Sequence, residues 1–334
     1  MKPTTDTSSL TQAASNAQVS RLSVPRGDSW ARLLLTPRLL LPLVGATLLA
    51  LAPAAGAQKK DAPLLPLPPP PGVEVLRDLE YDQGGHERNR LDLYLPRKAT
   101  RPLPVIVWVH GGGWTRGDKL RGPAFRFATN GYAVASINYR FSQDAIFPAQ
   151  IHDCKAAIRW LRAHAGKYGL DSEHFGAWGG SAGGHLVALL GTTAGVKELE
   201  GPGGNEDQSS RVQAVVDWYG PTDFMTAGAK DTRINLIGGE PQSNKEKAAK
   251  ASPMTYVSKD AAPFLIMHGD QDKTVPISQS ETFAEALRKA GADAMFVVVK
   301  GGGHAGALFT NAENMKLVED FFRKHLIAPK PARQ

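Results

Sequence analysis

The feature that most constrains the fold is the alternation of short apolar runs with amphipathic runs between residues 73 and 327. The runs that open 103–114 and fill 263–269 are apolar at successive positions, which is typical of strands buried on both faces. The runs 148–169 and 278–291 instead repeat apolar residues with the period of a helix. Strands and helices that alternate over this length predict a mostly parallel sheet with helices on both faces.

The apolar runs give eight expected strands, so we expect an α/β protein with an eight-stranded sheet. The first two, 73–81 and 90–96, are expected to be antiparallel. The remaining strands are expected within 103–114, 132–140, 174–180, 212–220, 263–269 and 293–304. Helices are expected near 119–130, over 148–169, directly after Ser181, over 278–291 and over 312–326.

Residues 1–57 have the pattern of a secretory signal peptide. Two arginines precede the apolar stretch 39–52, and the small residues at 55–57 offer a cleavage site. The apolar stretch is short for a membrane span and contains Pro42. We therefore expect a secreted or periplasmic protein with no stable membrane span after cleavage. An uncleaved membrane anchor is the alternative.

The rest of the chain divides into three parts. Residues 58–72 are expected to be a proline-rich linker, because a proline run forms an extended spacer rather than part of a core. Residues 73–327 are expected to form one catalytic domain and residues 328–334 a flexible tail.

Composition excludes several functions. The only cysteine, Cys154, rules out an intramolecular disulfide and a cysteine-based zinc site, and its amphipathic surroundings favour a buried structural thiol. The net charge is +7, part of which lies in residues 1–57, and the rest of the chain has no Lys/Arg cluster. Nucleic acid is therefore not an expected partner.

Four glycines flank Ser181, two on each side, where an expected strand meets an expected helix. Gly179-x-Ser181-x-Gly183 in this context is the pattern of a nucleophile elbow, in which a sharp turn presents a serine at the N-terminus of a helix. A phosphate-binding loop is the alternative, but it would require a lysine and a longer glycine spacing. We therefore expect Ser181 to be a catalytic nucleophile.

A serine hydroxyl needs a base, and the base needs a carboxylate that orients it. His304 follows the last expected strand, in the chain order Ser, Asp, His of this arrangement, so we assign it as the base. His185 and His268 are the alternatives, each better explained as structural. For the carboxylate, the loop after 263–269 offers Asp270 and Asp272, and the residues alone leave both open.

The stretch His-Gly-Gly-Gly-Trp at 110–114 completes the arrangement. Glycines allow backbone N–H groups to turn towards a developing oxyanion, and fixed donors of this kind stabilise it. We expect the N–H groups of Gly112, Gly113 and Ala182 to form the oxyanion hole, with His110 and Trp114 bracing the loop. No metal or cofactor is needed for this chemistry.

These motifs together resemble the α/β-hydrolase superfamily, and within it small carboxylesterases related to hormone-sensitive lipase and to bacterial acetyl- and feruloyl-type esterases. The matching stretches are LDLYLP, VWVHGGGWTRGDK, GGSAGGHLVALL and HGDQDKTVP, within residues 90–305. The resemblance implies the α/β-hydrolase fold. It also implies that Asp272, which matches the acid of the family's His-Gly-x-x-Asp-x-x-Val-Pro stretch, is the triad acid.

The chain departs from this pattern in two ways. Lipase-like members usually carry an aspartate before the nucleophile, where this chain has Gly180, which favours the acetyl/feruloyl branch. Those members also carry an N-terminal helical cap, whereas only the proline-rich stretch precedes the first expected strand here. We therefore expect little or no cap domain and an open, shallow site.

The sequence thus predicts a secreted serine esterase that acts on small-molecule or polysaccharide-linked esters, with short acyl or carbohydrate-linked acetyl or feruloyl groups. Ser181, His304 and Asp272 would form the triad. A serine peptidase of the prolyl-oligopeptidase type is one alternative, although such enzymes normally carry a propeller and lack the HGGGW stretch. A formamidase or lactonase, or a non-catalytic binding protein on the same scaffold, are the others.

Overall fold

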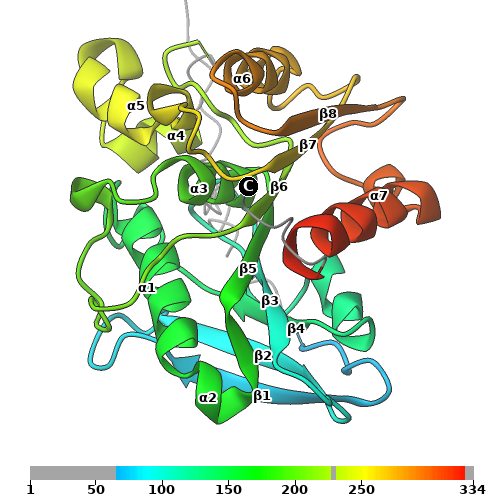
Figure 1. Ribbon diagram of the computed structural model, residues 1–334. Helices are drawn as coiled ribbons and strands as arrows, with labels where there is room; N and C mark the ends of the chain where they lie inside the picture. Colours follow the sequence, from blue (N-terminus) through cyan, green and yellow to red (C-terminus); the bar gives the residue numbers. More distant parts are fainter. Residues whose placement is uncertain (1–64, 227–230, 328–334) are drawn as a thin grey trace, which may run out of the picture. The chain divides into compact units, whose positions relative to one another are not determined.

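The computed structural model describes residues 65–226 and 231–327, and this part of the chain contains one eight-stranded sheet (Figure 1). The strand order is β1-β2-β4-β3-β5-β6-β7-β8. β1 and β2 pair antiparallel, as do β2 and β4, and the other pairs are parallel. The expected mostly parallel sheet is therefore confirmed. The strands are β1 (Val73–Glu80), β2 (Arg90–Pro96), β3 (Leu103–Val109), β4 (Ala133–Ile137), β5 (Leu170–Gly180), β6 (Ala214–Trp218), β7 (Phe264–Gly269) and β8 (Ala294–Val299).

The helices follow the expected alternation with differences at their ends. They are α1 (Ala149–Ala163), α2 (Ala165–Tyr168), α3 (Ala182–Thr192), α4 (Asp231–Ile237), α5 (Lys245–Ala251), α6 (Ser278–Lys289) and α7 (Ala312–Phe322). The segment expected to be helical near 119–130 forms the 3-10 helix η1 (Pro123–Thr129), because Gly122 and Gly131 leave room for only a short element. The last helix ends at Phe322 and continues as a π turn over Arg323–Ile327.

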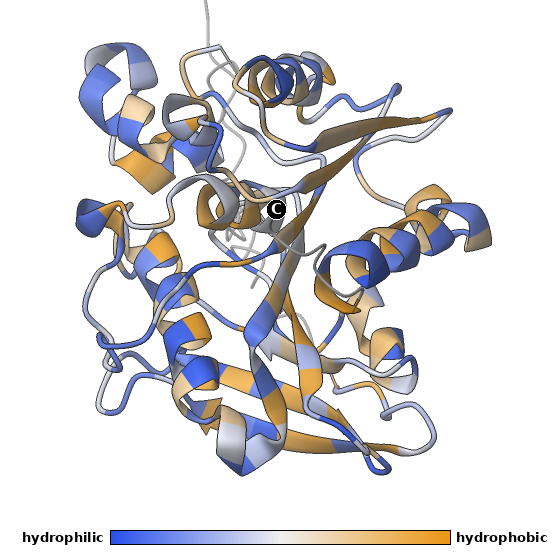
Figure 2. Cartoon of the chain, viewed as in Figure 1, coloured by the Kyte–Doolittle hydropathy of each residue, from blue (hydrophilic) through white to orange (hydrophobic). Residues whose placement is uncertain are grey.

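Both faces of the sheet are covered, because successive residues of the central strands point to opposite sides. Val105, Val107 and Val109 of β3 pack with residues of α1, α3 and α6, whereas Ile106 and Trp108 pack with residues of η1 and α7. Figure 2 shows the strands as mainly hydrophobic and α1 and α7 as mixed in hydropathy. The buried Cys154 lies in the first of these clusters, as expected of a structural thiol.

The parallel direction of the central strands sets the place of the site. β3, β5, β7 and β8 end at the same edge of the sheet, and the loops that follow them contain the glycines at 111–113, Ser181, Asp272 and His304. In open α/β sheets, ligands bind outside this edge. Figure 1 shows α3 leaving that edge beside β6.

The predicted signal peptide and C-terminal tail lie outside the described residues. Of the predicted linker, residues 65–72 are described and contain neither helix nor strand. The domain boundaries at 73 and 327 stay predictions. Within residues 65–226 and 231–327, no helix combines the length and apolarity needed to cross a bilayer.

Candidate active site

Ser181 lies on a sharp turn between β5 and α3. Its φ of 56° and ψ of −120° are strained for a residue with a Cβ, and its N–H donates to the Trp218 carbonyl (2.9 Å). A Cβ added to Gly179 would lie 2.4 Å from the Gly183 carbonyl, and one added to Gly183 would lie 2.1 Å from the Val109 carbonyl oxygen. The close approach of strand and helix expected from these two glycines is therefore present.

His304 connects Ser181 to Asp272. Its Nε2 lies 2.8 Å from Ser181 Oγ, and its Nδ1 lies 2.7 Å from Asp272 Oδ2. The three side chains follow β5, β7 and β8, so the sheet brings together residues far apart in the chain. This geometry allows His304 to accept the serine proton while the carboxylate holds the opposite ring nitrogen.

The Asp272 side chain is inaccessible to solvent, and it accepts four hydrogen bonds from the protein. Oδ1 accepts from the backbone N–H groups of Thr274 (2.7 Å) and Val275 (3.0 Å), and Oδ2 accepts from His304 and from His268 Nε2 (3.1 Å). Burial alone would raise the pKa of this carboxyl, but the hydrogen bonds outweigh burial and lower it. Asp272 is therefore ionised at neutral pH, as the partner of a charged imidazole must be.

Asp270, the other carboxylate considered, has a different place. Its Oδ1 accepts from the Gly301 N–H (2.8 Å), and Oδ2 lies 3.5 Å from Lys300 Nζ at the surface. The carboxylate that contacts His304 is thus Asp272, which agrees with the assignment implied by the family resemblance.

The two alternative histidines do not contact Ser181. His185 is buried, accepts from Trp114 Nε1 (3.2 Å) and donates to the Ala251 carbonyl (2.7 Å), and burial lowers its pKa to about 4. It therefore braces Trp114. His268 is also buried, and it contacts Asp272. The hydrogen bond from His268 to the acid was not predicted from the sequence, because it depends on how the loop after β7 folds back onto the strand.

The glycine loop after β3 lies directly against the nucleophile turn. A Cβ on Gly111 would lie 2.7 Å from the Gly180 carbonyl oxygen. Gly112 and Gly113 have φ values of 116° and 62°, which favour glycine, and within the described residues neither N–H has a backbone acceptor. Ala182 begins α3, so its N–H has no partner inside the helix. These three N–H groups can therefore donate hydrogen bonds to a ligand oxygen.

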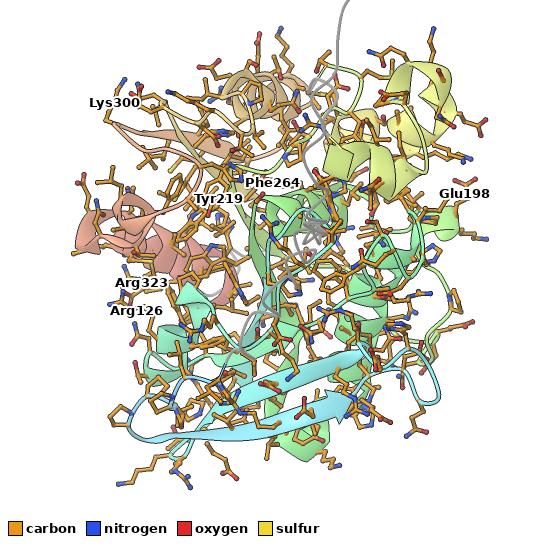
Figure 3. The ribbon with its side chains drawn as sticks, turned by 180° about the vertical axis from the view of Figure 1, so that it is seen from behind. Arg126, Glu198, Tyr219, Phe264, Lys300 and Arg323 are labelled. Carbon is orange, nitrogen blue, oxygen red and sulfur yellow. The ribbon has the colours of Figure 1, made fainter. Side chains whose placement is uncertain are left out.

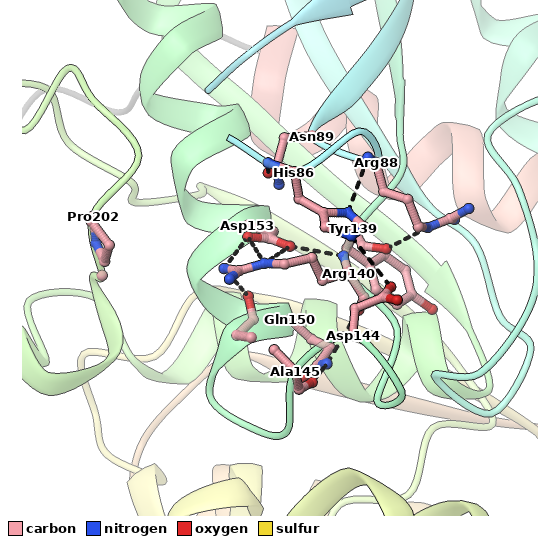
Figure 4. A network of polar contacts seen from close by, with 12 residues as sticks. His86, Arg88, Asn89, Tyr139, Arg140, Asp144, Ala145, Gln150, Asp153 and Pro202 are labelled. Carbon is pink, nitrogen blue, oxygen red and sulfur yellow. Dashed lines mark hydrogen bonds and ion pairs between the residues drawn. The ribbon is translucent and has the colours of Figure 1, made fainter. Parts of the chain in front are cut away.

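His110 braces this loop as expected. Burial lowers its pKa to about 4, since the hydrogen bond to Gly111 offsets burial only in part, and the ring is neutral at pH 7. Nδ1–H donates to the Gly111 carbonyl (2.7 Å), and Nε2 accepts from Arg88 (3.3 Å). Tyr139 stacks on the ring (4.5 Å between centroids) and donates to the His110 carbonyl (2.9 Å). Figure 4 shows Arg88 also donating to the Tyr139 carbonyl (2.8 Å).

A cavity of about 430 Å³ opens in front of Ser181 and His304. Gly112 and Gly113 line it, which places the candidate oxyanion donors beside the nucleophile. Between β6 and β7 the described residues form only α4, α5 and two short 3-10 turns, as expected for a chain with little cap. α4 nevertheless adds Thr232 to the wall, where a Cβ on Gly113 would lie 2.9 Å from its methyl group.

Tyr219 is a cavity residue that the sequence analysis did not identify (Figure 3). Its ring packs edge-on against His304 (4.8 Å between centroids), and its φ of 46° is unusual for a tyrosine. A Cβ on Gly180 would lie 3.0 Å from the Tyr219 hydroxyl, so Gly180 leaves the space that this hydroxyl needs. Burial raises the pKa of the phenol, which therefore keeps its proton. Its position at the end of a buried strand is the only sequence signal that could have indicated it.

Asp217 of β6 is a buried carboxylate behind the site. Oδ1 accepts from the Gly220 N–H (3.0 Å), whereas Oδ2 has no hydrogen-bond partner among the described residues. Burial raises its pKa from 3.8 to about 6. The folded state thus binds the proton more tightly than the unfolded chain, so Asp217 costs stability as pH rises from about 4 to about 6, and the full cost remains above that range.

We predict that Asp217→Asn removes this cost, since the amide keeps the Oδ1 acceptor without a charge. The free energy of unfolding of the variant, relative to the wild type, should rise by about 2–3 kcal/mol between pH 4 and pH 7. Urea unfolding at several pH values measures this difference. Asp207→Asn, at an exposed loop position, is the control and should show no such rise. A pH-independent difference for Asp217→Asn would contradict the prediction.

The chain is similar to several known proteins. The BD-FAE family model matches residues 91–287. Two curated relatives from Mycobacterium tuberculosis (strain ATCC 25618 / H37Rv) are similar to the chain. The probable carboxylic ester hydrolase LipM is 35% identical over 64% of this chain and 51% of its own length. The esterase LipQ is 36% identical over 69% of this chain and 58% of its own length. The chain therefore spans little more than half the length of these relatives.

The chain matches a larger share of two solved structures than of these curated relatives. A truncated carbohydrate esterase from gut microbiota is 35% identical, with a TM-score of 0.73, and covers 77% of this chain and 98% of its own. An acetyl ester-xyloside bifunctional hydrolase from Caldicellulosiruptor lactoaceticus is 28% identical, with a TM-score of 0.63, over 70% of this chain and 87% of its own. At 35% and 28% identity, the chain shares sequence as well as fold with these two esterases.

Proposed function

The chain belongs to the BD-FAE family of α/β-hydrolase proteins, and from this premise we propose that it is a serine esterase that hydrolyses carboxylic esters. The observation that carries the proposal is the hydrogen-bonded series Ser181–His304–Asp272 at the mouth of one cavity, with the loop of Gly112 and Gly113 beside it. Nucleophile, base, acid and oxyanion donors are the parts that acyl transfer requires.

In the proposed first half-reaction, Ser181 Oγ attacks the ester carbonyl carbon while His304 Nε2 accepts the hydroxyl proton. The carbonyl oxygen becomes an oxyanion, which the N–H groups of Gly112, Gly113 and Ala182 stabilise. The intermediate then collapses: the bond to the alcohol oxygen breaks, His304 returns the proton to that oxygen, and an acyl-serine remains.

In the second half-reaction, a water molecule attacks the acyl-serine carbonyl and gives its proton to His304. Collapse of this second oxyanion releases the carboxylic acid, and the proton returns to Ser181 Oγ. Asp272 stays ionised throughout and stabilises the imidazolium that forms twice per turnover. Its four hydrogen bonds, including the one from His268, support this role because they favour the charged carboxylate.

The proposed substrates are short acyl esters and carbohydrate-linked acetyl or feruloyl esters. The support is the likeness to a carbohydrate esterase and to an acetyl ester-xyloside hydrolase, together with the small segment between β6 and β7, which leaves room for a bulky alcohol. The relatives reported above are esterases, which supports an ester rather than a peptide bond as the target. A non-catalytic binding protein would not need the hydrogen bond between Ser181 and His304, which also favours an enzyme.

We predict that the purified protein hydrolyses p-nitrophenyl esters with kcat/KM greatest for acetate and propionate and lower for octanoate. A cavity of about 430 Å³ with glycines on one wall and Tyr219 on another fits a short acyl chain better than a long one. Acetylated xylan and methyl ferulate, assayed in parallel, distinguish acetyl from feruloyl specificity. Hydrolysis of none of these esters by folded protein would contradict the proposed function.

Export is part of the proposal, supported by the basic, apolar and small-residue pattern of residues 1–57. Expression of the full chain in a bacterial host, followed by N-terminal sequencing of periplasmic and cytoplasmic fractions, tests it. A mature protein that begins at Gln58 is the expected product. An unprocessed chain recovered only from the cytoplasm would overturn the proposal.

A further inference from the structure

We infer that this cavity selects esters that carry a negative charge close to the reacting carbonyl, and that Arg116 binds that charge. The inference rests on the proposed ester hydrolysis and adds a substrate class to it. Among the described residues that line the cavity there are two arginines, Arg116 and Arg233, and no aspartate or glutamate. The Asp272 carboxylate lies behind His304 and is inaccessible to solvent, so it does not compete with a ligand for Arg116.

Arg116 is tied to the oxyanion loop. Its backbone N–H donates to the Gly112 carbonyl (3.2 Å), and a Cβ added to Gly112 would lie 2.1 Å from the Arg116 carbonyl oxygen and 3.2 Å from its Cγ. The side chain thus starts in contact with the loop that would hold the oxyanion. From its position beside Gly112, the Arg116 guanidinium can reach a substrate group that lies a few bonds away from the ester carbonyl.

The Arg116 side chain is exposed and makes no hydrogen bond or ion pair with the described residues. Asp118, the nearest acidic residue along the chain, is engaged elsewhere, because it accepts from the Leu120 N–H (2.9 Å) and from Asn138 Nδ2 (3.4 Å). Five other arginines of the domain have carboxylate partners, whereas Arg116 shares with Arg126 the absence of such a partner among the described residues. The five pairs are Arg77 with Asp92, Arg90 with Glu80, Arg140 with Asp153, Arg159 with Glu200, and Arg323 with Asp320.

Guanidinium groups bind carboxylates with two parallel hydrogen bonds, and salt weakens such a pair when the guanidinium is exposed, as that of Arg116 is. Arg233, the other arginine of the lining, is only 2% exposed and interacts with the protein itself, so Arg116 alone carries the inference. The ligand is therefore an ester with a carboxylate on its acyl side, such as a dicarboxylic half-ester, or on its alcohol side, such as an ester of an acidic sugar.

Two substrate pairs test this inference, each made of an anion and its neutral methyl ester. The acyl-side pair is p-nitrophenyl hydrogen succinate and its methyl ester, and the alcohol-side pair is p-acetoxybenzoate and its methyl ester. For each pair, the selectivity is kcat/KM for the anion divided by kcat/KM for the neutral ester. Arg116→Gln removes the charge and keeps most of the side chain.

We expect Arg116→Gln to lower the selectivity about tenfold in at least one pair, mainly through KM for the anion, which corresponds to loss of one charge-assisted hydrogen bond. Added salt should lower the wild-type selectivity in the same pair. Arg126→Gln is the matched control: Arg126 lies exposed on η1, is not one of the residues that line the cavity, and lies apart from the cavity residue Tyr219 in Figure 3, so its loss should leave the selectivity unchanged.

The outcomes separate the two proposals. If the wild type hydrolyses none of the four esters, anionic or neutral, the proposed function fails. If it hydrolyses them but Arg116→Gln alters the selectivity of neither pair, or alters it no more than Arg126→Gln does, only the anion inference is overturned. The pair in which selectivity falls identifies the side of the ester that carries the charge.

Discussion

Ser181→Ala is expected to lower kcat for p-nitrophenyl acetate by about six orders of magnitude, the scale seen when a triad nucleophile is removed. Among the residues that the structure describes, the Ser181 hydroxyl, which His304 Nε2 contacts at 2.8 Å, is the one serine oxygen hydrogen-bonded to that imidazole. Without it no acyl-enzyme forms, and only water activated by His304 remains. A fixed-time assay of p-nitrophenol release measures the loss of kcat.

The control for this variant is its folding. Alanine keeps the Cβ and the strained backbone of the turn, so the free energy of unfolding should change by less than about 1 kcal/mol. Ser278→Ala, at the exposed start of α6, should retain full activity. A folded Ser181→Ala protein with wild-type turnover would exclude Ser181 as the nucleophile.

Asp272→Asn is expected to lower kcat/KM by about four orders of magnitude. An amide in this place presents either an N–H or a neutral oxygen to His304 Nδ1, so the imidazole loses the carboxylate that stabilises its charged form. The variant also leaves the donors His268, Thr274 and Val275 facing a neutral group. The pH dependence of the residual kcat/KM reports the change at His304, and urea unfolding separates it from loss of fold.

Asp270→Asn is the matched control, because it removes a carboxylate from the same loop. Asp270 accepts from the Gly301 N–H and lies at the surface, so this variant should retain activity within about threefold. If Asp270→Asn proved the more damaging of the two, the assignment of Asp272 as the acid would be wrong.

Much of the fold could be predicted because its signals are local. Apolar runs such as that of β3 read as buried strands whatever surrounds them, and parallel strands must end at one edge of the sheet. Because ligands bind at that edge, the residues that directly follow each strand are the candidates for the site. The pattern Gly179-x-Ser181-x-Gly183 added a steric requirement that the close contacts of both glycines confirm.

The features that sequence reasoning missed depend on contacts between distant segments. Tyr219 packs on His304 because β6 and β8 both lie beside β7 and end at the same edge, and its position after a buried strand is the one local signal that marks it. The space beside Gly180 is explained by the same tyrosine. His268 reads as a core histidine, and its hydrogen bond to Asp272 arises from the path of the loop after β7.

The central claim is that Ser181 is a nucleophile activated by His304, and covalent labelling tests it most directly. A fluorophosphonate probe should add one equivalent to the wild type, abolish ester hydrolysis in proportion to labelling, and be found on Ser181 by peptide mass spectrometry. Ser181→Ala should remain unlabelled. Hydrolysis that persists in fully labelled protein, or a label on another residue that accounts for the lost activity, would contradict the claim.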